Sequence, residues 1–348
     1  MNEGRGMQAW AAEIERQAQV KQDFIVPTTD LVMTPDSAVS FVSNQQSFKG
    51  TPNFHGQLAG RLKIPKAYYD RVKESNPPLL ADNVNHWLTQ VPEKRMVRVM
   101  DGLARAYLSD SYRILDNKDL LQSILPTLRE HDFKIKSSEI LYNRMYLKVT
   151  FPEMRAEITH SKRVGDFVEG GLVISNSEIG QGSLKIEPFM YFLACTNGMV
   201  QNSLVRKYHV GRRYDSDMEY RELITDATNK AINDAFWMKV QDLVKGAIDV
   251  DLFKIRVEHL ETTTQNGIEK EPEQVVEIVK RNYALSDTQG AEIFTNLMNG
   301  DDLSQFGLAN AVTAAGNIQN LYEESNKLET IGGDIIDLPR DQWENLAA

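Results

Sequence analysis

The chain has 348 residues, 41% of them hydrophobic and 25% charged, a composition that is ordinary for a globular protein with one large or two modest domains. No apolar run approaches the roughly 18–20 residues of a membrane span, and the first ten residues lack the apolar core of an export signal. The single cysteine, Cys195, excludes an intrachain disulfide. We therefore expect a cytoplasmic protein with no membrane partner.

The net charge of −10 is concentrated toward one end of the chain. From Asp287 to Ala348 there are eleven acids and two bases, whereas from Lys94 to Arg213 there are nineteen lysines and arginines and thirteen acids. A mildly basic centre with an acidic end suggests a polyanionic partner and an acidic tail.

Residues 1–78 are predicted to be a helical and loop region. Trp10 and Ile14 share one face of its first helix, and Asn76-Pro77-Pro78 marks its end. The elements expected in it are helices over 7–22 and 65–72, short strands over 31–33 and 38–42, and a loop over 45–60.

Residues 79–258 are predicted to form an α+β core. Asp101-Gly102 lies between two apolar-rich runs and is the strongest hairpin signal, because both residues tolerate positive φ. Asn117 can cap a helix to about His131, in which Pro126 predicts a kink or break. Further elements are expected over 79–90 (helix) and over 133–137 and 140–151 (strands).

A second hairpin is predicted inside the segment 170–214, around which we expect the core to be organised. Residues 172–174 have strand character, and Gly180 and Gly182 bracket a tight turn. The strand that follows should bury Leu184 and Ile186.

Two helices are expected after this hairpin. Pro188 is placed as a first-turn residue, and the apolar residues after it can form one core-facing stripe. The stretch 217–247 carries a long helical signal, with Met238 on its buried stripe. The first stripe consists of Phe189, Met190, Phe192, Leu193 and Met199.

The C-terminal part is predicted to consist of a polar linker over 259–272, a helical region over 273–325 with one helix around 308–315, and an acidic, loosely ordered tail over 326–348. Strand pairs and helices do not alternate regularly. The sequence therefore predicts an α+β fold with a central antiparallel sheet, a long packed helix and a helical C-terminal region.

A basic cluster is the main candidate site. No acid occurs from Gln201 to Tyr214, and lysine and arginine neutralise phosphates while tyrosine stacks on unpaired bases. The alternative interpretation is a solvated loop. The predicted nucleic-acid contacts are Arg206, Lys207, Tyr208, His209, Arg212, Arg213 and Tyr214, with Lys162, Arg163, Lys134 and Lys136 as further candidates.

Other chemical signals favour structural roles. His209 has no second histidine at metal-ligand spacing, and Cys195 lies in an apolar context that is typical of a buried thiol. We expect no metal and no cofactor. A nuclease alternative would use Asp101, Asp110, Asp116 and Asp119, although turns and caps account for them as well. The polar groups Asn176, Ser177, Glu178, Thr196 and Asn197 either line a site or bond to buried turns and caps.

Four segments resemble the phage and plasmid-like family known as "domain of unknown function 932". They are RAYLSDSYRILDN at 105–117, GLVISNSEIGQGSLKIEPFMYFLACTNGMV at 171–200, His-Val-Gly at 209–211 and NAVTAAGN at 310–317. The resemblance covers roughly residues 90–325 and implies an origin in a mobile element, but no mechanism.

The order of strand pairs followed by a long helix also resembles the core of single-strand annealing proteins that phages encode. The function predicted on this basis is binding and annealing of single-stranded DNA by a homo-oligomer, without covalent chemistry, with the acidic tail competing for the groove or recruiting a protein. The alternatives are a metal-dependent nuclease and an anti-defence interaction module.

Overall fold

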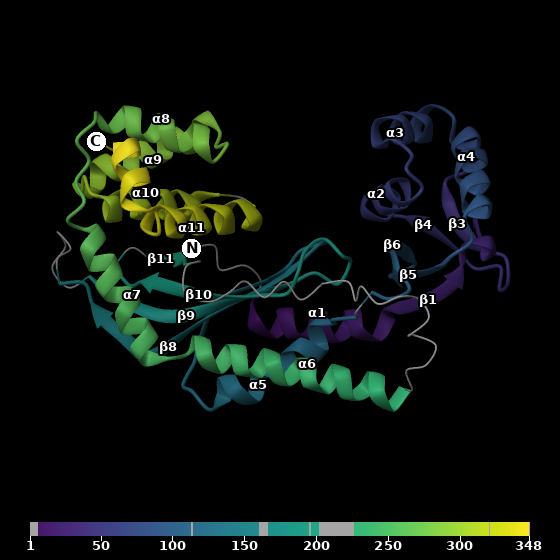
Figure 1. The fold of residues 1–348 in the computed structure, drawn as a ribbon, viewed down its shortest axis with the longest axis horizontal. Coiled ribbons are helices and arrows are strands. Elements are labelled where there is room, and N and C mark those ends of the chain that lie inside the picture. The colour runs from purple at the N-terminus through teal and green to yellow at the C-terminus, as the bar shows by residue number, and fades with distance from the viewer. Residues whose placement is uncertain are drawn as a thin grey trace.

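The computed structural model describes residues 6–112, 114–159, 166–194, 196–201, 226–319 and 321–347. In this part of the chain two sheets and the helices that cover them form the predicted α+β fold (Figure 1). None of the described helices is long and apolar enough to cross a membrane.

The first sheet has six strands in the order β1-β5-β6-β4-β3-β2, and only the β4–β6 pair is parallel. Its strands bury an apolar face against α2, α3 and α4. The bounds are β1 Gln22–Pro27, β2 Leu31–Met33, β3 Ala38–Phe41, β4 Ser47–Gly50, β5 Lys94–Met100 and β6 Leu103–Ser109, with α2 Pro52–Arg61, α3 Lys66–Ser75, α4 Pro77–Gln90 and the short η1 Thr28–Asp30.

Two expectations for this region are wrong. The predicted loop over 45–60 holds β4 and α2 instead, because Thr51 caps the helix through the N–H of Phe54 and Pro52 fixes its first turn. The expected break at 78 does not divide the chain into two units. Asn76 caps α4, and α4 packs beside β2. Strands β5 and β6, which follow the expected break, belong to the same sheet as β2.

The predicted hairpin at Asp101-Gly102 is confirmed. It joins β5 to β6, and the two residues have φ of 54° and 71°. Both lie in the left-handed region that a tight turn between twisted strands requires.

The second sheet has five antiparallel strands in the order β11-β10-β9-β8-β7. Its central hairpin matches the prediction, since Ile186 pairs with Ile174 and both are buried together with Leu184. The bounds are β7 Lys134–Ile140, β8 Met145–Glu157, β9 Phe167–Asn176, β10 Lys185–Phe192 and β11 Asn197–Val200.

The helix predicted from Pro188 is wrong, because this residue lies inside β10 and pairs with Leu172 of β9. Met190 and Phe192 pack into the main core, while Phe189 packs on the opposite face. A strand buried on both faces reads as a continuous apolar run, and periodicity alone does not distinguish it from a buried helix.

One face of the second sheet is covered by α1, α5, α6 and α7, and the other face by α10 and α11 (Figure 1). Trp10 and Ile14 of α1 are buried here as predicted. Pro126 does not end α5, which continues to Arg129. The bounds are α1 Met7–Val20, α5 Asn117–Arg129, α6 Asp226–Ala247 and α7 Val250–Thr263.

The predicted long helix corresponds to α6, although the start expected at 217 lies outside the described residues. Its buried stripe differs from the prediction, since Met238 is 63% exposed while Phe236, Val240 and Val244 are buried.

The C-terminal region is helical, as expected, and includes the helix predicted around 308–315. The prediction of a loosely ordered tail is wrong, because the segment folds as helices that bury Leu328, Ile331 and Ile335 at helical spacing. The backbone oxygen of Ala347 accepts hydrogen bonds at 2.8 and 2.9 Å from the N–H groups of Glu269 and Lys270, in the predicted linker. The bounds are α8 Pro272–Asn282, α9 Asp287–Gly300, α10 Gln305–Ala315, η3 Gly316–Ile318, α11 Tyr322–Ile336 and α12 Arg340–Ala347.

Candidate functional site

A small, open pocket lies where the two sheets meet, with a volume of only about 20 Å³. The end of α1, the strands β5 and β6, the start of α5, the β7–β8 turn and the β9–β10 loop all contribute to it. Its lining residues are Gln17, Lys21, Arg98, Met100, Arg105, Asn117, Ile140, Leu141, Tyr142, Asn143, Arg144, Met145, Asn176, Glu178 and Ile179.

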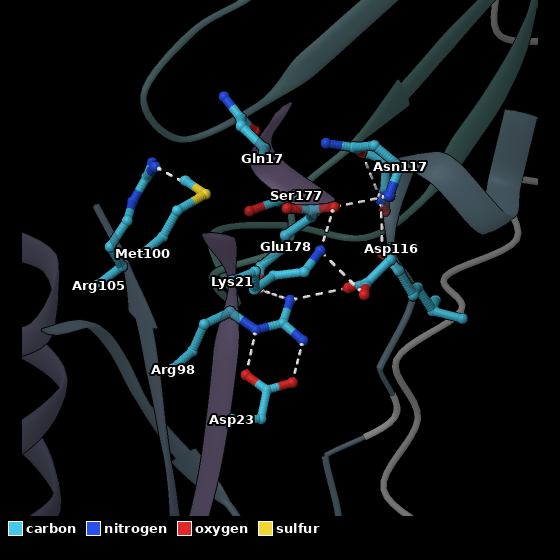
Figure 2. A network of polar contacts seen from close by, with 12 residues as sticks. Gln17, Lys21, Asp23, Arg98, Met100, Arg105, Asp116, Asn117, Ser177 and Glu178 are labelled. Atoms are coloured by element: carbon cyan, nitrogen blue, oxygen red, sulfur yellow. Dashed lines mark hydrogen bonds and ion pairs between the residues drawn. The ribbon is translucent and has the colours of Figure 1, made fainter. Parts of the chain in front are cut away.

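The buried end of this pocket is built around Arg98, which is 1% exposed. Its guanidinium donates to both carboxylate oxygens of Asp23 at 2.8 and 2.7 Å and to the backbone oxygen of Glu178 at 2.8 Å (Figure 2). Burial alone would lower the pKa of Arg98, but the hydrogen bond to Asp23 and the charge of Asp116 raise it above its ordinary value. The arginine is therefore charged and fully engaged.

Lys21 completes this network beside the N-terminus of α5. Its ammonium lies 2.9 Å from Asp116 and 3.1 Å from Glu178. Glu178 also accepts the backbone N–H of Asn117 at 2.7 Å, so a carboxylate from the β9–β10 loop occupies the positive end of a helix dipole. Two cations and three carboxylates are paired with one another here, which makes this end a structural joint between the sheets.

Of the polar groups predicted either to line a site or to satisfy turns and caps, Asn176, Ser177 and Glu178 bond to turns and to the start of α5, and Asn176 and Glu178 also line the pocket. Asn176 donates to the backbone oxygen of Leu115 at 2.8 Å and to Asn117 at 2.9 Å. These bonds join the segments 105–117 and 171–200, two of the segments that carry the family resemblance.

A further bond joins the second of these segments to the one at 310–317. Asn197 donates to the hydroxyl of Thr313 at 2.6 Å. Three of the four resemblance segments are thus connected to one another by hydrogen bonds.

The exposed end of the pocket carries two guanidinium groups without a carboxylate partner in the described part of the chain. Arg105 donates to the backbone oxygen of Tyr142 and lies over its ring at 4.3 Å from the centroid. Arg144 donates to Ser175, to the backbone oxygen of Ser183 and to that of Gln181, at 3.0 to 3.3 Å. All of these acceptors are neutral, so neither guanidinium forms an ion pair with a carboxylate of the described residues, although the charge of Arg105 contributes to lowering the pKa of Asp101.

This end of the pocket also exposes an aromatic ring and holds a buried donor without a partner. Tyr142 is 47% exposed. The Nε of Arg105 is buried and has no hydrogen-bond partner among the described residues. Guanidinium groups that form no ion pair with a described carboxylate, beside an exposed ring, can hold an anion whose remainder is flat and apolar on its faces.

Most of the predicted binding residues lie outside the described residues, namely Arg206, Lys207, Tyr208, His209, Arg212, Arg213, Tyr214, Lys162 and Arg163; Cys195 does too. The other two lie on β7 and do not line the pocket. Lys134 is exposed, whereas Lys136 pairs with Glu169 at 3.2 Å and lies over the Tyr191 ring at 4.1 Å.

The acids of the nuclease alternative do not form a cluster in the described structure. Asp101 pairs with Arg16 of α1, and Asp116 with Lys21 and Arg98. Burial raises the pKa of Asp119, and the charge of Asp116 adds to this. Among the described residues no three histidine, cysteine, aspartate or glutamate side chains are grouped to hold a metal ion.

Sequence reasoning missed Arg105, Tyr142 and Arg144. Arg105 stands in one of the segments quoted for the resemblance, but nothing near it in the sequence shows that no carboxylate will reach it in the fold. Tyr142 and Arg144 fall inside the strand predicted over 140–151, whereas the structure places them in the turn between β7 and β8, and turns are where binding residues are often found.

Comparisons of the chain with protein-family models, with curated proteins and with solved structures found no match. The resemblance to the "domain of unknown function 932" family stays a prediction that rests on the quoted segments.

Proposed function

We propose that this protein binds single-stranded DNA and anneals complementary strands as an oligomer, in the cytoplasm of a bacterial cell that carries the mobile element encoding it. The observation that carries the proposal is a pair of guanidinium groups, Arg105 and Arg144, that form no ion pair among the described residues and lie beside the exposed ring of Tyr142. Phosphates are attracted to the two guanidinium groups, and a base can stack on the ring of Tyr142.

A single strand suits this site better than a duplex. Stacking on Tyr142 requires a base whose face is free, and in a duplex the bases are stacked on one another. The residues that line the pocket come from several elements and do not form a row along one helix that could read successive bases. We therefore propose binding without a strict sequence preference.

The basic segment 206–214 remains part of the proposal as a prediction from sequence. Its test is Arg212→Glu with Arg213→Glu, which reverses two charges and should weaken strand binding strongly. If only this variant loses binding and Arg105 and Arg144 are dispensable, the pocket is not the contact that matters.

The acidic tail requires a different proposal from the predicted one. Because α11 and α12 are packed helices with buried residues, they are not a free segment that can compete for DNA. A protein partner at the acidic end would therefore contact a folded surface of α12.

The experiment is fluorescence anisotropy of a labelled single-stranded oligonucleotide in EDTA. We expect wild type to bind, and Arg105→Gln with Arg144→Gln to bind roughly tenfold more weakly or worse, as the loss of charge-assisted hydrogen bonds implies. The matched control is Lys254→Gln with Arg340→Gln, which removes two exposed cations from α7 and α12.

Three outcomes count against the proposal. Absence of binding by wild type would favour a protein-interaction module, and unchanged affinity of the double variant would exclude the pocket. Strand cleavage that depends on Mg²⁺ would favour the nuclease alternative. Size-exclusion chromatography with and without the oligonucleotide tests the oligomer.

A further inference from the structure

The strands at the edges of the two sheets are β1, β2, β7 and β11, and three of these edges are blocked. The edge of β2 is occupied, because Asn85 of α4 accepts the N–H of Met33 at 2.7 Å and donates to its C=O at 2.9 Å. β7 carries Lys134 and Lys136, and its register with β8 is interrupted. β11 has four residues and packs against α11. Charges, bulges, short strands and covering helices all keep a sheet edge from pairing with another chain.

The remaining edge, β1, is regular, and its outward backbone groups can be identified. β1 has six residues and pairs with β5 without a register shift. Just beyond it, Thr28 donates its N–H to the C=O of Glu93 at 2.8 Å. Because the backbone groups of successive residues point alternately to the two sides of a strand, those of Asp23, Ile25 and Pro27 point away from β5. Proline is tolerated at this position, since its missing N–H would face away from the sheet.

These outward groups have no hydrogen-bond partner in the described part of the chain. No bond reaches the N–H of Asp23 or of Ile25, or the C=O of either, and all three residues with outward groups are exposed. Ile25 is 56% exposed, although Met96 opposite it on β5 is buried. Asp23 adds no free charge to the edge, because Arg98 holds its carboxylate. A regular, exposed edge with an apolar side chain is a template on which another strand can pair.

We infer that β1 pairs antiparallel with β1 of a second copy of this chain, with the twofold axis at Ile25. In this register the N–H of Ile25 donates to the C=O of Ile25 in the other copy, and the N–H of Asp23 donates to the C=O of Pro27. Only the C=O of Asp23 is left to water, opposite the N–H that proline lacks. The inference rests on the proposed function only for the oligomer, to which it gives an interface.

The side chains of β1 favour a second copy as the partner, because the strand is complementary to itself in this register. Ile25 meets Ile25 on the exposed face, and Phe24 faces Val26 on the other face. No two like charges oppose each other, since Asp23 lies opposite Pro27. Moving the axis to Phe24 would instead place the carboxylate of Asp23 opposite Ile25.

The experiment is sedimentation velocity of the full chain without DNA, over a range of protein concentrations. We expect a dimer that dissociates on dilution. Ile25→Lys should raise its dissociation constant roughly tenfold or more, because two like charges would meet at the axis. The matched control is Val42→Lys, which should leave the dimer unchanged, since Val42 is 59% exposed and lies just after β3 rather than on β1.

Cross-linking locates the axis without relying on a loss of association. Cys195→Ser removes the single native thiol. With Ile25→Cys added, a short bismaleimide should link most of the protein into covalent dimers, because the two positions face each other across the axis. Val42→Cys in the same background should give few.

A monomer at every concentration would overturn the inference. So would a dimer that Ile25→Lys leaves intact, or one in which Ile25→Cys is linked no better than Val42→Cys, since either result places the interface elsewhere. If the dimer forms through β1 and wild type binds no oligonucleotide, strand binding fails and the interface stands. Strand binding by a chain that stays monomeric gives the reverse result.

Discussion

Lys148 of β8 and Glu329 of α11 form an ion pair in which both side chains are 1% exposed. The ammonium also lies over the ring of Tyr322, 5.1 Å from its centroid, while the hydroxyl of Tyr322 contacts that of Ser137 at 2.6 Å. Through these contacts α11 is fixed across the second sheet by buried polar groups. Such a pair is strongly destabilising when only one partner is removed.

Replacing Lys148 by methionine should therefore lower the free energy of unfolding by about 3–5 kcal/mol, because the carboxylate of Glu329 is left buried and uncompensated. The double variant Lys148→Met with Glu329→Leu should recover most of this loss. Urea unfolding measures both, and Arg340→Ala, which breaks an exposed pair on α12, should cost less than about 1 kcal/mol. Equal costs for the single and double variants would show that the charge of the pair is irrelevant.

The approach of α11 to β11 depends on Gly333. A Cβ at this position would lie 1.7 Å from the backbone oxygen of Val200, whereas a Cβ at Gly246 of α6 would meet nothing within 4 Å. Gly333→Ala should cost about 1–3 kcal/mol or more by overpacking. Gly246→Ala should be neutral or stabilising by up to about 1 kcal/mol. Thermal unfolding of the two variants separates them, and similar melting temperatures would contradict the close approach.

His55 of α2 predicts a dependence of stability on pH. Its Nδ1 lies 2.7 Å from the hydroxyl of Tyr69, and burial lowers the pKa of His55 from 6.5 to about 4. Between these values the unfolded chain binds a proton that the folded chain does not. The stability from this group is therefore complete above pH 6.5 and is lost as the pH falls toward about 4, by roughly 3 kcal/mol in all.

The measurement is the free energy of unfolding of wild type and His55→Gln across this window. Wild type should lose more stability than the variant as the pH falls, and parallel curves would mean that His55 is not buried as a neutral ring.

Local chemistry made some elements predictable from the sequence. Asp101-Gly102 specifies its turn because both residues adopt positive φ, and the hairpin follows from two residues alone. The strand at Pro188 and the helix α11 could not be predicted in this way, because their sequence patterns are ambiguous. Burial on both faces removes the alternation of a strand, and acids on the exposed face of a helix obscure its apolar stripe.

The candidate site was not predictable in the same way. Arg98 and Asp23 are 75 residues apart and meet only because β1 pairs with β5. That Arg105 and Arg144 form no ion pair with a described carboxylate depends on how the whole fold places these side chains. A sequence shows which residues are charged, but not which of them form ion pairs.

The most direct test of strand binding through the pocket is the dependence of affinity on salt. For single strands, the logarithm of the binding constant falls with the logarithm of salt concentration by roughly 0.7 per phosphate contact. Arg105→Gln with Arg144→Gln should make this slope shallower by roughly 1.4, while Arg105→Lys with Arg144→Lys, which keeps both charges, should leave it near the wild-type value. A wild-type slope near zero, or the same slope in the glutamine variant, would contradict the account.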